Sequence, residues 1–588
     1  MADRGPAALV ARDSDSRRRD WLIAPLWVVL LLPLLAWGVP NREADAVLFG
    51  GSAWKAERFS AAAAAGERSG RRAGADRDLN PVEHRNTLVD LTASDAARAE
   101  ILRRYRLFSH QPDEMINFMA LQRMRLRQFD FDPGLYQYGG AWIYAVGAAL
   151  ALGAAGGLLT LSSDPDVYLE APELFGRFYV AARLLSLVSG GLLLVAAVRI
   201  GRRLGGPWCG PLSAALVMLC PVFLTMSLEA KPHLPSAAAT AWAVLLAMRH
   251  LEQPTGGSAT RLGLVIGAAF GLVLTGIFAA LVLPALRLAR WVSSSEQRPV
   301  DGKAPTRLRL VHVAVVAGLM YAACNPYVVW NALFDRALLL DNLSNSTAMY
   351  AVTRLAEGAL RTIVLLAEAG GVLTILVGVI GLPVIAWQSR ARAALLLAPA
   401  LGVLLMSVAL AAGKPGEFGR FLIVPAVVMA ISAARVIWMV AARSTGVGVL
   451  LLVGLLAFDG RHSLSYLEAF VLDSSNNHTR ASAARFLQVH LRPAERIGVA
   501  QEPAPYSVPP LHFATRTVIL LPRTEPPGVE TKALPEWLVL TADDTHAVAQ
   551  AWWSRHYILQ LVTKSAPSPP LIPWASKPVL LFRRADLR

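Results

Sequence analysis

The sequence is poor in cysteine and in charged residues, and both shortages exclude classes of protein. It has three cysteines in 588 residues, Cys209, Cys220 and Cys324, with neither the spacing of metal ligands nor the even number of a disulfide framework. Charged residues make up 17% of the chain and hydrophobic residues 54%, gathered in long runs. Glycine-rich nucleotide motifs and internal repeats are also absent. The composition therefore predicts a polytopic membrane protein whose chemistry is not driven by a bound nucleotide.

The formal net charge of +15 comes mainly from arginines in short loops between the apolar runs. These loops lack the interleaved aromatic residues of a nucleic-acid groove, so no nucleic-acid partner is expected. They indicate topology instead, because cytoplasmic loops are rich in Lys and Arg. Residues 1–20 hold five arginines and precede the apolar run 21–40, which predicts a cytoplasmic tail and a cytoplasmic N-terminus.

The apolar runs predict about eleven membrane spans. The run 139–161 is long enough to cross, but a crossing there would move every later basic loop out of the cytoplasm. We therefore expect 139–161 to lie in the interface or to re-enter, although hydropathy alone leaves a crossing open. The other expected spans are 21–40, 178–198, 207–227, 234–250, a hairpin over 262–288, 310–325, 362–388, 393–411, 420–442 and 445–459.

This topology predicts a transmembrane domain over 21–459, with a large first outer loop over 41–177, and an extracytoplasmic α/β domain over 460–588. Within that last domain RIGVA, TVILL, EWLVL and PVLLF are expected strands, and TRASAARFLQVHL is an expected amphipathic helix. In the first loop, Thr92 and Asp95 fit a capping box at the start of a helix.

The outer loops hold most of the ionisable residues expected near the bilayer. The first loop has an acidic pair, Asp113 and Glu114, in QPDEMINFM. Because loops on one side of a bundle converge, we expect the outer loops to frame one cavity. Its further candidate residues are Tyr136, Tyr138, Glu229, Lys231, His233, Asn325, Tyr327, Lys414, Glu417 and Arg420.

Simpler interpretations exist for most of these residues. Asp113 and Glu114 follow Pro112, so they suit the positive end of a helix dipole. Lys414 and Arg420 suit snorkelling at a span end, and His233 suits a hydrogen-bonded interfacial position. Tyr136, Tyr138, Trp142 and Tyr144 have the composition of an aromatic belt, and Asn325 precedes a proline that can end a span. Glu368, inside an expected span, is a functional candidate by default, with no partner assigned.

An ordered set of segments carries a resemblance to a known family. QPDEMINFM, FDPGLYQYGGAWIYAVG, RFYVAARLL, SLEAKPHLP, NPYVVWN and KPGEFGRFLIVP follow one another between residues 20 and 460. Together they resemble the GT-C membrane glycosyltransferases, particularly the group related to protein O-mannosyltransferases and to the lipid A aminoarabinose transferase. The resemblance implies transfer of a sugar from a polyprenyl-phosphate donor to an acceptor hydroxyl on the outer face, with inversion.

The resemblance also implies roles for individual residues. Asp113 would be the base that takes the proton of the acceptor hydroxyl, and Glu114 would orient the acceptor or tune its neighbour. Lys414, Arg420 and Arg183 would hold the donor phosphate. Where relatives carry an acid in a later outer loop, this chain has Lys231 and His233. That departure argues against a divalent metal there, and no other cofactor is implied.

A polytopic transporter or lipid flippase is the main alternative, because polar residues in a membrane bundle often line a path. Inverted repeats and paired broken helices are not evident in the sequence, which disfavours it. An assembly or receptor protein built around 460–588 is a second alternative. The sequence leaves the sugar, the carrier length and the acceptor open, whether glycolipid, protein or polymer.

Overall fold

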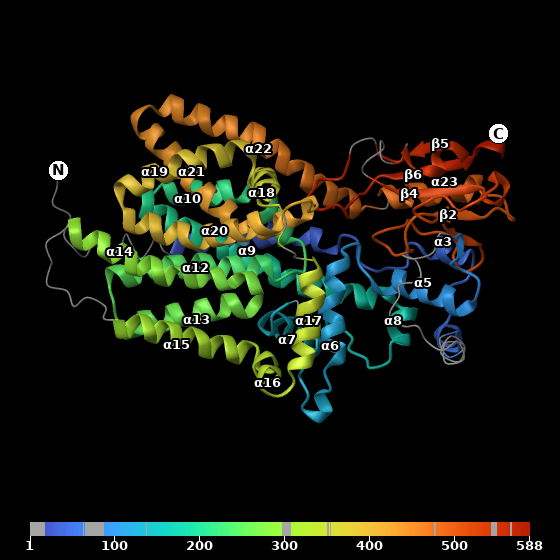
Figure 1. Ribbon diagram of the computed structural model, residues 1–588, viewed down its shortest axis with the longest axis horizontal. Coiled ribbons are helices and arrows are strands. Elements are labelled where there is room, and N and C mark those ends of the chain that lie inside the picture. The colour runs from blue at the N-terminus through green and yellow to red at the C-terminus, as the bar shows by residue number, and fades with distance from the viewer. Residues whose placement is uncertain are drawn as a thin grey trace. The chain divides into compact units, whose positions relative to one another are not determined.

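The computed structural model describes residues 18–62, 64, 87–136, 138–296, 307–349, 352, 354–475, 478–542, 548, 550–564 and 567–587. The chain forms two compact units, each assembled from three segments (Figure 1). Unit 1 comprises Met1–Leu35, Ile116–Ala149 and Ala181–Leu467, and unit 2 comprises Ala36–Met115, Leu150–Val180 and Glu468–Arg588.

Unit 1 is a bundle of apolar helices whose close contacts depend on small residues. Gly263 and Gly267 lie on α13 (Gly256–Leu272), which packs along α15 (Arg307–Cys324). A Cβ at Gly267 would lie 2.4 Å from the Ala317 carbonyl oxygen, so only glycine fits there. Small residues at four-residue spacing let two helix backbones approach, as in membrane helix pairs generally.

Several spans of unit 1 are broken where the sequence predicted continuous helices. The expected span 362–388 consists of α18 (Leu355–Gly370) and α19 (Val372–Gln388), bent by 107° at Gly371, whose φ is +83°. The expected span 207–227 consists of α10 (Cys209–Met218) and α11 (Pro221–Ser227), bent by 71°. Pro221 explains the second break, because it removes a backbone donor and disfavours helix at the preceding residue.

Among the described residues, six helices are long and apolar enough to cross a membrane, or up to nine if each of three bent pairs is one span. An integral membrane protein is thus supported, while eleven crossings and the sides of the termini stay predictions. The long or paired elements not yet introduced are α9 (Pro172–Gly205), α12 (His233–Glu252), η4 (Leu274–Leu281), α14 (Val282–Glu296), α16 (Pro326–Phe334), α20 (Arg390–Leu410), η5 (Gly416–Leu422), α21 (Ile423–Arg443) and α22 (Thr445–Asp473).

The ambiguous run 139–161 folds as α7, Gly140–Ala155. Its 16 residues extend about 24 Å, less than the roughly 30 Å of a bilayer core. The length favours an interfacial or re-entrant placement over a crossing, although neither is tested.

Unit 2 contains a six-stranded mixed sheet of order β1-β3-β2-β4-β6-β5. The four expected strands are confirmed, and α23 (Thr479–His490) is the expected amphipathic helix. Two strands were missed, β1, which has two residues, and β5, an edge strand with a half-exposed face. The strands are β1 (Val89–Asp90), β2 (Ile497–Val499), β3 (Val518–Leu520), β4 (Trp537–Thr541), β5 (Tyr557–Val562) and β6 (Val579–Arg584).

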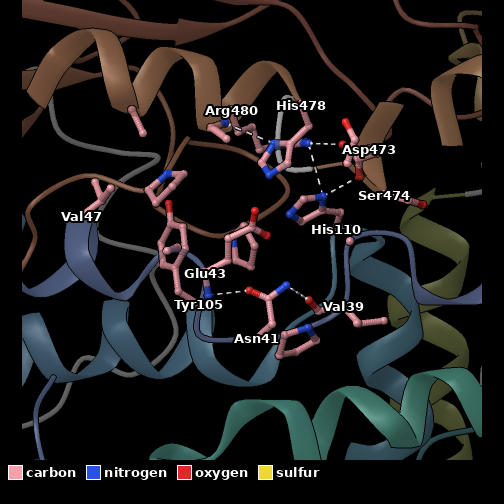
Figure 2. Close-up of a pocket in the computed structure, with 18 of the residues that line it drawn as sticks. Val39, Asn41, Glu43, Val47, Tyr105, His110, Asp473, Ser474, His478 and Arg480 are labelled. Carbon is pink, nitrogen blue, oxygen red and sulfur yellow. Dashed lines mark hydrogen bonds and ion pairs between the residues drawn. The ribbon is translucent and has the colours of Figure 1, made fainter. Parts of the chain in front are cut away.

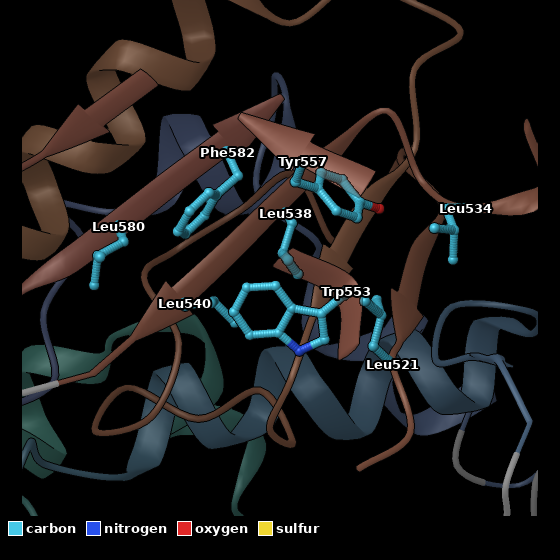
Figure 3. Packing of buried hydrophobic residues seen from close by; sticks show 8 residues of the cluster. All are labelled: Leu521, Leu534, Leu538, Leu540, Trp553, Tyr557, Leu580 and Phe582. Atoms are coloured by element: carbon cyan, nitrogen blue, oxygen red, sulfur yellow. The ribbon is translucent and has the colours of Figure 1, made fainter. Parts of the chain in front are cut away.

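A hydrophobic cluster on this sheet stabilises unit 2 (Figure 3). Leu538 and Leu540 from β4 lie beside Leu580 and Phe582 from β6, and Trp553 packs on the same cluster. Each such fully buried side chain contributes roughly 1.5–3 kcal/mol. The sheet therefore has its own core.

Two parts of the predicted first loop, up to Met115 and from Leu150 onward, belong to unit 2, and the part between them belongs to unit 1. β1 pairs antiparallel with β3, Asp90 opposite Ile519. The Tyr105 hydroxyl, on α5 (Asp95–Leu107), donates to the Val508 carbonyl at 2.8 Å. α22 also runs without interruption to Asp473, so the predicted boundary between 459 and 460 falls inside a helix.

The predicted capping box at α5 is wrong by two residues. Ser94 is the N-cap, and its hydroxyl accepts a hydrogen bond from the Ala97 amide at 3.2 Å. Thr92 does not cap the helix. Its hydroxyl donates a hydrogen bond to Asp90 and accepts one from the Val518 amide. It therefore ties β1 to β3 rather than starting a helix.

Candidate functional site

The acidic pair lies in a short helical turn of unit 2. Residues Pro112–Glu114 form the 3-10 helix η2, which leads into α6 (Met115–Arg123). The Gln111 side chain caps this turn, because its oxygen accepts a hydrogen bond from the Asp113 amide at 3.0 Å. The two acids therefore do lie in the first turn of a helical segment, as the helix-start interpretation expects.

The two carboxylates of the pair have different environments. Glu114 is fully buried and accepts a hydrogen bond from the Ser109 hydroxyl at 2.7 Å. Asp113 is only half-buried. Burial raises the pKa of the nearby Tyr506 phenol, and the negative charge of Asp113 adds to that rise. The turn therefore presents one carboxylate toward its surroundings and keeps the other inside the protein.

In unit 1, aromatic rings from three distant loops meet. His233, at the start of α12, packs edge-on against Tyr138 at 6.3 Å and against Phe421 at 5.0 Å between ring centroids. Phe421 in turn contacts Phe418, both on η5. The loops around residues 138, 233 and 418 therefore meet, while the single cavity expected from all the outer loops stays a prediction.

Two cations lie over this aromatic group. The Arg420 guanidinium lies 5.2 Å from the Phe421 ring centroid, and Lys414 Nζ lies 5.3 Å from that of Phe418. Arg420 is only 9% exposed, which does not fit a side chain extended into water. The snorkelling interpretation therefore fails for Arg420. Glu417, on the same short helix, is half-buried.

Glu229 and Lys231 form an ion pair inside unit 1, with Nζ and Oε2 3.1 Å apart and both side chains 1% exposed. A carboxylate neutralised in this way is a poor ligand for a divalent cation. Within the described ranges, no three His, Cys, Asp or Glu side chains come together as metal ligands.

The tyrosine and asparagine candidates of unit 1 are held in hydrogen bonds between segments. Tyr136 donates to Asp132 at 2.6 Å, and burial raises the pKa of its phenol. Asn325 accepts from the Gly140 amide at 2.7 Å, and the Tyr327 hydroxyl accepts from the Phe131 amide at 2.8 Å. These contacts fix α7 and its preceding loop against the neighbouring helices α15 and α16.

Arg183 is fully buried in α9. One of its guanidinium nitrogens donates to the Leu35 carbonyl at 2.8 Å, at the end of the first apolar helix. The residue thus joins two helices of unit 1, and its predicted contact with a phosphate remains untested.

The sequence did not predict two clusters of polar side chains, although Glu368 of the first was named as a candidate without a partner. In unit 1, Glu368 pairs with His462 Nε2 at 3.1 Å and accepts a hydrogen bond from Tyr466. His462 and Tyr466 lie four residues apart on α22, so both reach the same neighbour. Because the last span was expected to end at 459, these residues were not considered as partners.

The second missed cluster borders a cavity of about 310 Å³ in unit 2 (Figure 2). His110 Nδ1 lies 2.6 Å from Asp473 Oδ2, and Arg480 Nη1 lies 3.2 Å from Asp473 Oδ1. His478 lines the same cavity, with its ring 5.7 Å from that of His110. Sequence reasoning lacked a signal here, because His110 lies far from the other three along the chain.

Comparison with protein-family models and with curated proteins finds no match. Among solved structures, the chain is similar to ArnT from Cupriavidus metallidurans bound to undecaprenyl phosphate, at 12% identity and TM-score 0.42, over 84% of this chain and 98% of that one. The oligosaccharyltransferase AglB from Archaeoglobus fulgidus, in complex with an inhibitory peptide and a dolichol-phosphate, matches at 14% identity and TM-score 0.38, over 68% of this chain and 58% of that one. Membrane glycosyltransferases of the GT-C fold are thus among the matched structures. The likeness is remote.

Proposed function

We propose that this protein is an integral-membrane glycosyltransferase. It moves a sugar from a polyprenyl-phosphate donor to an acceptor hydroxyl on the extracytoplasmic face, with inversion at the anomeric carbon. The observation that carries the proposal is the division of the acidic pair into a half-buried Asp113 and a fully buried Glu114. A base must reach the acceptor, and a supporting acid must not compete with it.

Asp113 acts as the base. It removes the proton of the acceptor hydroxyl while that oxygen forms a bond to the sugar's C1, on the face opposite the phosphate. The bond from C1 to the phosphate oxygen breaks, and polyprenyl phosphate leaves with the electron pair. A phosphate monoester is a stable leaving group, so no acid is required on that side.

Glu114 is a positioning residue in this proposal. Its bond to Ser109 and its complete burial support a role in fixing the turn that presents Asp113. Of the two roles expected for Glu114, orienting the acceptor or tuning its neighbour, full burial favours the second.

Lys414 and Arg420 hold the donor phosphate. A planar guanidinium binds phosphate oxygens through two parallel hydrogen bonds, and an aromatic ring beneath a cation limits its orientation. Arg183 is a further proposed phosphate ligand, with one guanidinium nitrogen already bonded to Leu35.

Release of polyprenyl phosphate from a panel of lipid-linked sugars tests the proposal, with the protein in liposomes and a membrane extract as acceptor. Asp113→Asn should lower the rate about 10²–10⁴-fold, the usual contribution of a positioned base. Glu468→Gln, which removes an exposed acid of the same unit, is the control and should leave the rate unchanged. Equal rates for wild type and Asp113→Asn would reject Asp113 as the base.

A transporter or flippase remains a second candidate, because the structure has the broken helices that the sequence did not reveal. The backbone amides of Leu373 and Thr374 at the start of α19 donate to Asp459 on α22, beside the break at Gly371. Discontinuous helices are typical of substrate sites in transporters. Passage of a radiolabelled lipid-linked sugar across sealed vesicles, without covalent transfer, would favour this candidate.

A further inference from the structure

The cavity of unit 2 is a built pocket with no assigned role. Its walls come from segment 36–47, the end of α5, the end of α22 and α23 (Figure 2). A cavity of about 310 Å³ lies at the lower end of the usual range for small-molecule sites. That space suits one or two sugar-sized rings rather than a lipid chain.

The strongest charges around the cavity are balanced within the protein. Asp473 is buried and accepts hydrogen bonds from His110, Arg480 and the Ser576 amide. Arg480 is 1% exposed and also donates to the carbonyls of Trp574 at 2.6 Å and Tyr506 at 3.3 Å. A carboxylate and a guanidinium engaged in this way do not attract a free ion. The two exposed charges of the lining, Glu43 and Arg485, have opposite signs, so the ligand should be neutral overall.

His478 adds a neutral hydrogen-bonding group. Its Nδ1 accepts a hydrogen bond from the Ala481 amide at 3.2 Å, at the start of α23. Burial lowers the pKa of this imidazole to about 4, and the positive charge of His110 adds to the effect. At neutral pH the ring is therefore uncharged, with its proton on Nε2.

The rest of the lining mixes apolar surface with groups that bond hydroxyls. Val39, Pro40 and Pro505 supply aliphatic surface. Glu43 and Gln488 line the same cavity and are exposed, so a carboxylate and an amide are accessible from solvent. Amides and imidazoles both donate and accept, as hydroxyl groups do.

We propose that this cavity binds a sugar ring of the acceptor, so that the acceptor is a glycan or a glycolipid. The inference rests on the proposed function and adds the class of the acceptor. A pyranose is neutral, carries hydroxyls around its rim and presents apolar C–H faces, which matches the lining. Asp113 belongs to the same unit, and Gln111, whose side chain caps its turn, directly follows the lining residue His110.

Saturation-transfer NMR on the full-length protein in nanodiscs, without donor, tests the inference. The probes are methyl glycosides of glucose, galactose, mannose and 4-amino-arabinose, with glycylglycine and inorganic phosphate as comparisons. At least one glycoside should bind, and Gln488→Ala should weaken that binding about tenfold, the effect of one lost hydrogen bond to a ligand. Ser474→Trp, which places an indole at an exposed lining position, should abolish it.

Val489→Ala is the matched control, because Val489 follows Gln488 on α23, is 80% exposed and does not line the cavity. Binding that survives both Gln488→Ala and Ser474→Trp would overturn the inference, as would the absence of glycoside binding. Glycylglycine binding that Ser474→Trp removes would identify a peptide site instead. This assay contains no donor and requires no turnover, so it reports glycoside binding whether or not Asp113 is the base. Failure of the proposed base and failure of this site are therefore separable.

Discussion

At the scale of single residues, Arg420 and Lys414 are cations that each lie over a phenylalanine ring. The geometry of a guanidinium over Phe421 limits its orientations, and a flexible ammonium in its place would lose both the stacking and the bidentate contact. Arg420→Lys should therefore raise the KM for the lipid-linked donor about tenfold while kcat changes little. Steady-state kinetics with varied donor measures this. Arg361→Lys is the comparison, because Arg361 is a neighbouring arginine whose Nε donates to the Lys414 carbonyl. An equal effect there would show that Arg420 acts only through packing.

The lowered pKa of His478 predicts how the stability of the folded protein depends on pH. Because its pKa in the folded protein is about 4, below the ordinary value of 6.5, the unfolded chain binds its proton more readily. Stability is therefore complete above pH 6.5 and is lost as the pH falls from 6.5 toward 4, by roughly 3 kcal/mol at most. His478→Asn keeps an N-cap oxygen and removes the titration. Its thermal midpoint should vary less over this range than that of wild type, and identical pH profiles would contradict the assignment.

Sequence reasoning at this scale grouped candidate residues from several outer loops but did not predict their contacts. Tyr138, His233 and the segment around Phe418 meet within unit 1, whereas the acidic pair of the same predicted group belongs to unit 2. The sequence left two roles open for Glu114, orienting the acceptor or tuning its neighbour. It did not predict the burial of Glu114 or its hydrogen bond from Ser109, because both depend on tertiary packing.

At the scale of elements, the contact of α13 with α15 depends on glycine at 267. Gly267→Ala would place a methyl group against the Ala317 carbonyl, so the helices must separate, at a cost of roughly 1–3 kcal/mol. Gly318→Ala is the control on α15, where an added Cβ meets no atom within 4 Å. It should be neutral or should stabilise by up to about 1 kcal/mol. Thermal unfolding in detergent distinguishes the two, and equal midpoints would reject the close packing.

The elements that sequence patterns predicted are those with a strong local signal. Four strands rich in β-branched and aliphatic residues were recognised, whereas β1 has two residues and exists only because β3 lies beside it. The break at Gly371 was missed because the apolar run continues across it. The pair Gly370-Gly371 does not by itself indicate a positive φ. In the structure Gly371 has a φ of +83°, and a Cβ there would clash with the Asp459 side chain.

At the scale of the whole molecule, unit 2 joins chain ends that the sequence assigned to different domains. The predicted domain 460–588 lacks β1 and α5, and therefore the partners of Val518 and Val508. Expressed alone, it should unfold at a lower temperature than a fusion of 36–115 to 468–588 through a Gly/Ser linker. Circular dichroism melts and hydrogen exchange of the β3 amides measure the difference. Equal protection in the two fragments would show that 460–588 is an independent domain.

The pairing of Asp90 with Ile519 also implies a delay during synthesis, because β1 is made long before its partner β3. At about 5–20 residues per second, the roughly 430 residues between these partners take about 20–90 s to be translated. During that interval the first-loop segment has already emerged, while the strand it must pair with does not yet exist. A newly made chain must therefore keep this edge from pairing with other chains until the C-terminal segment has been made. Slowed translation of the last third should increase the demand for holding chaperones.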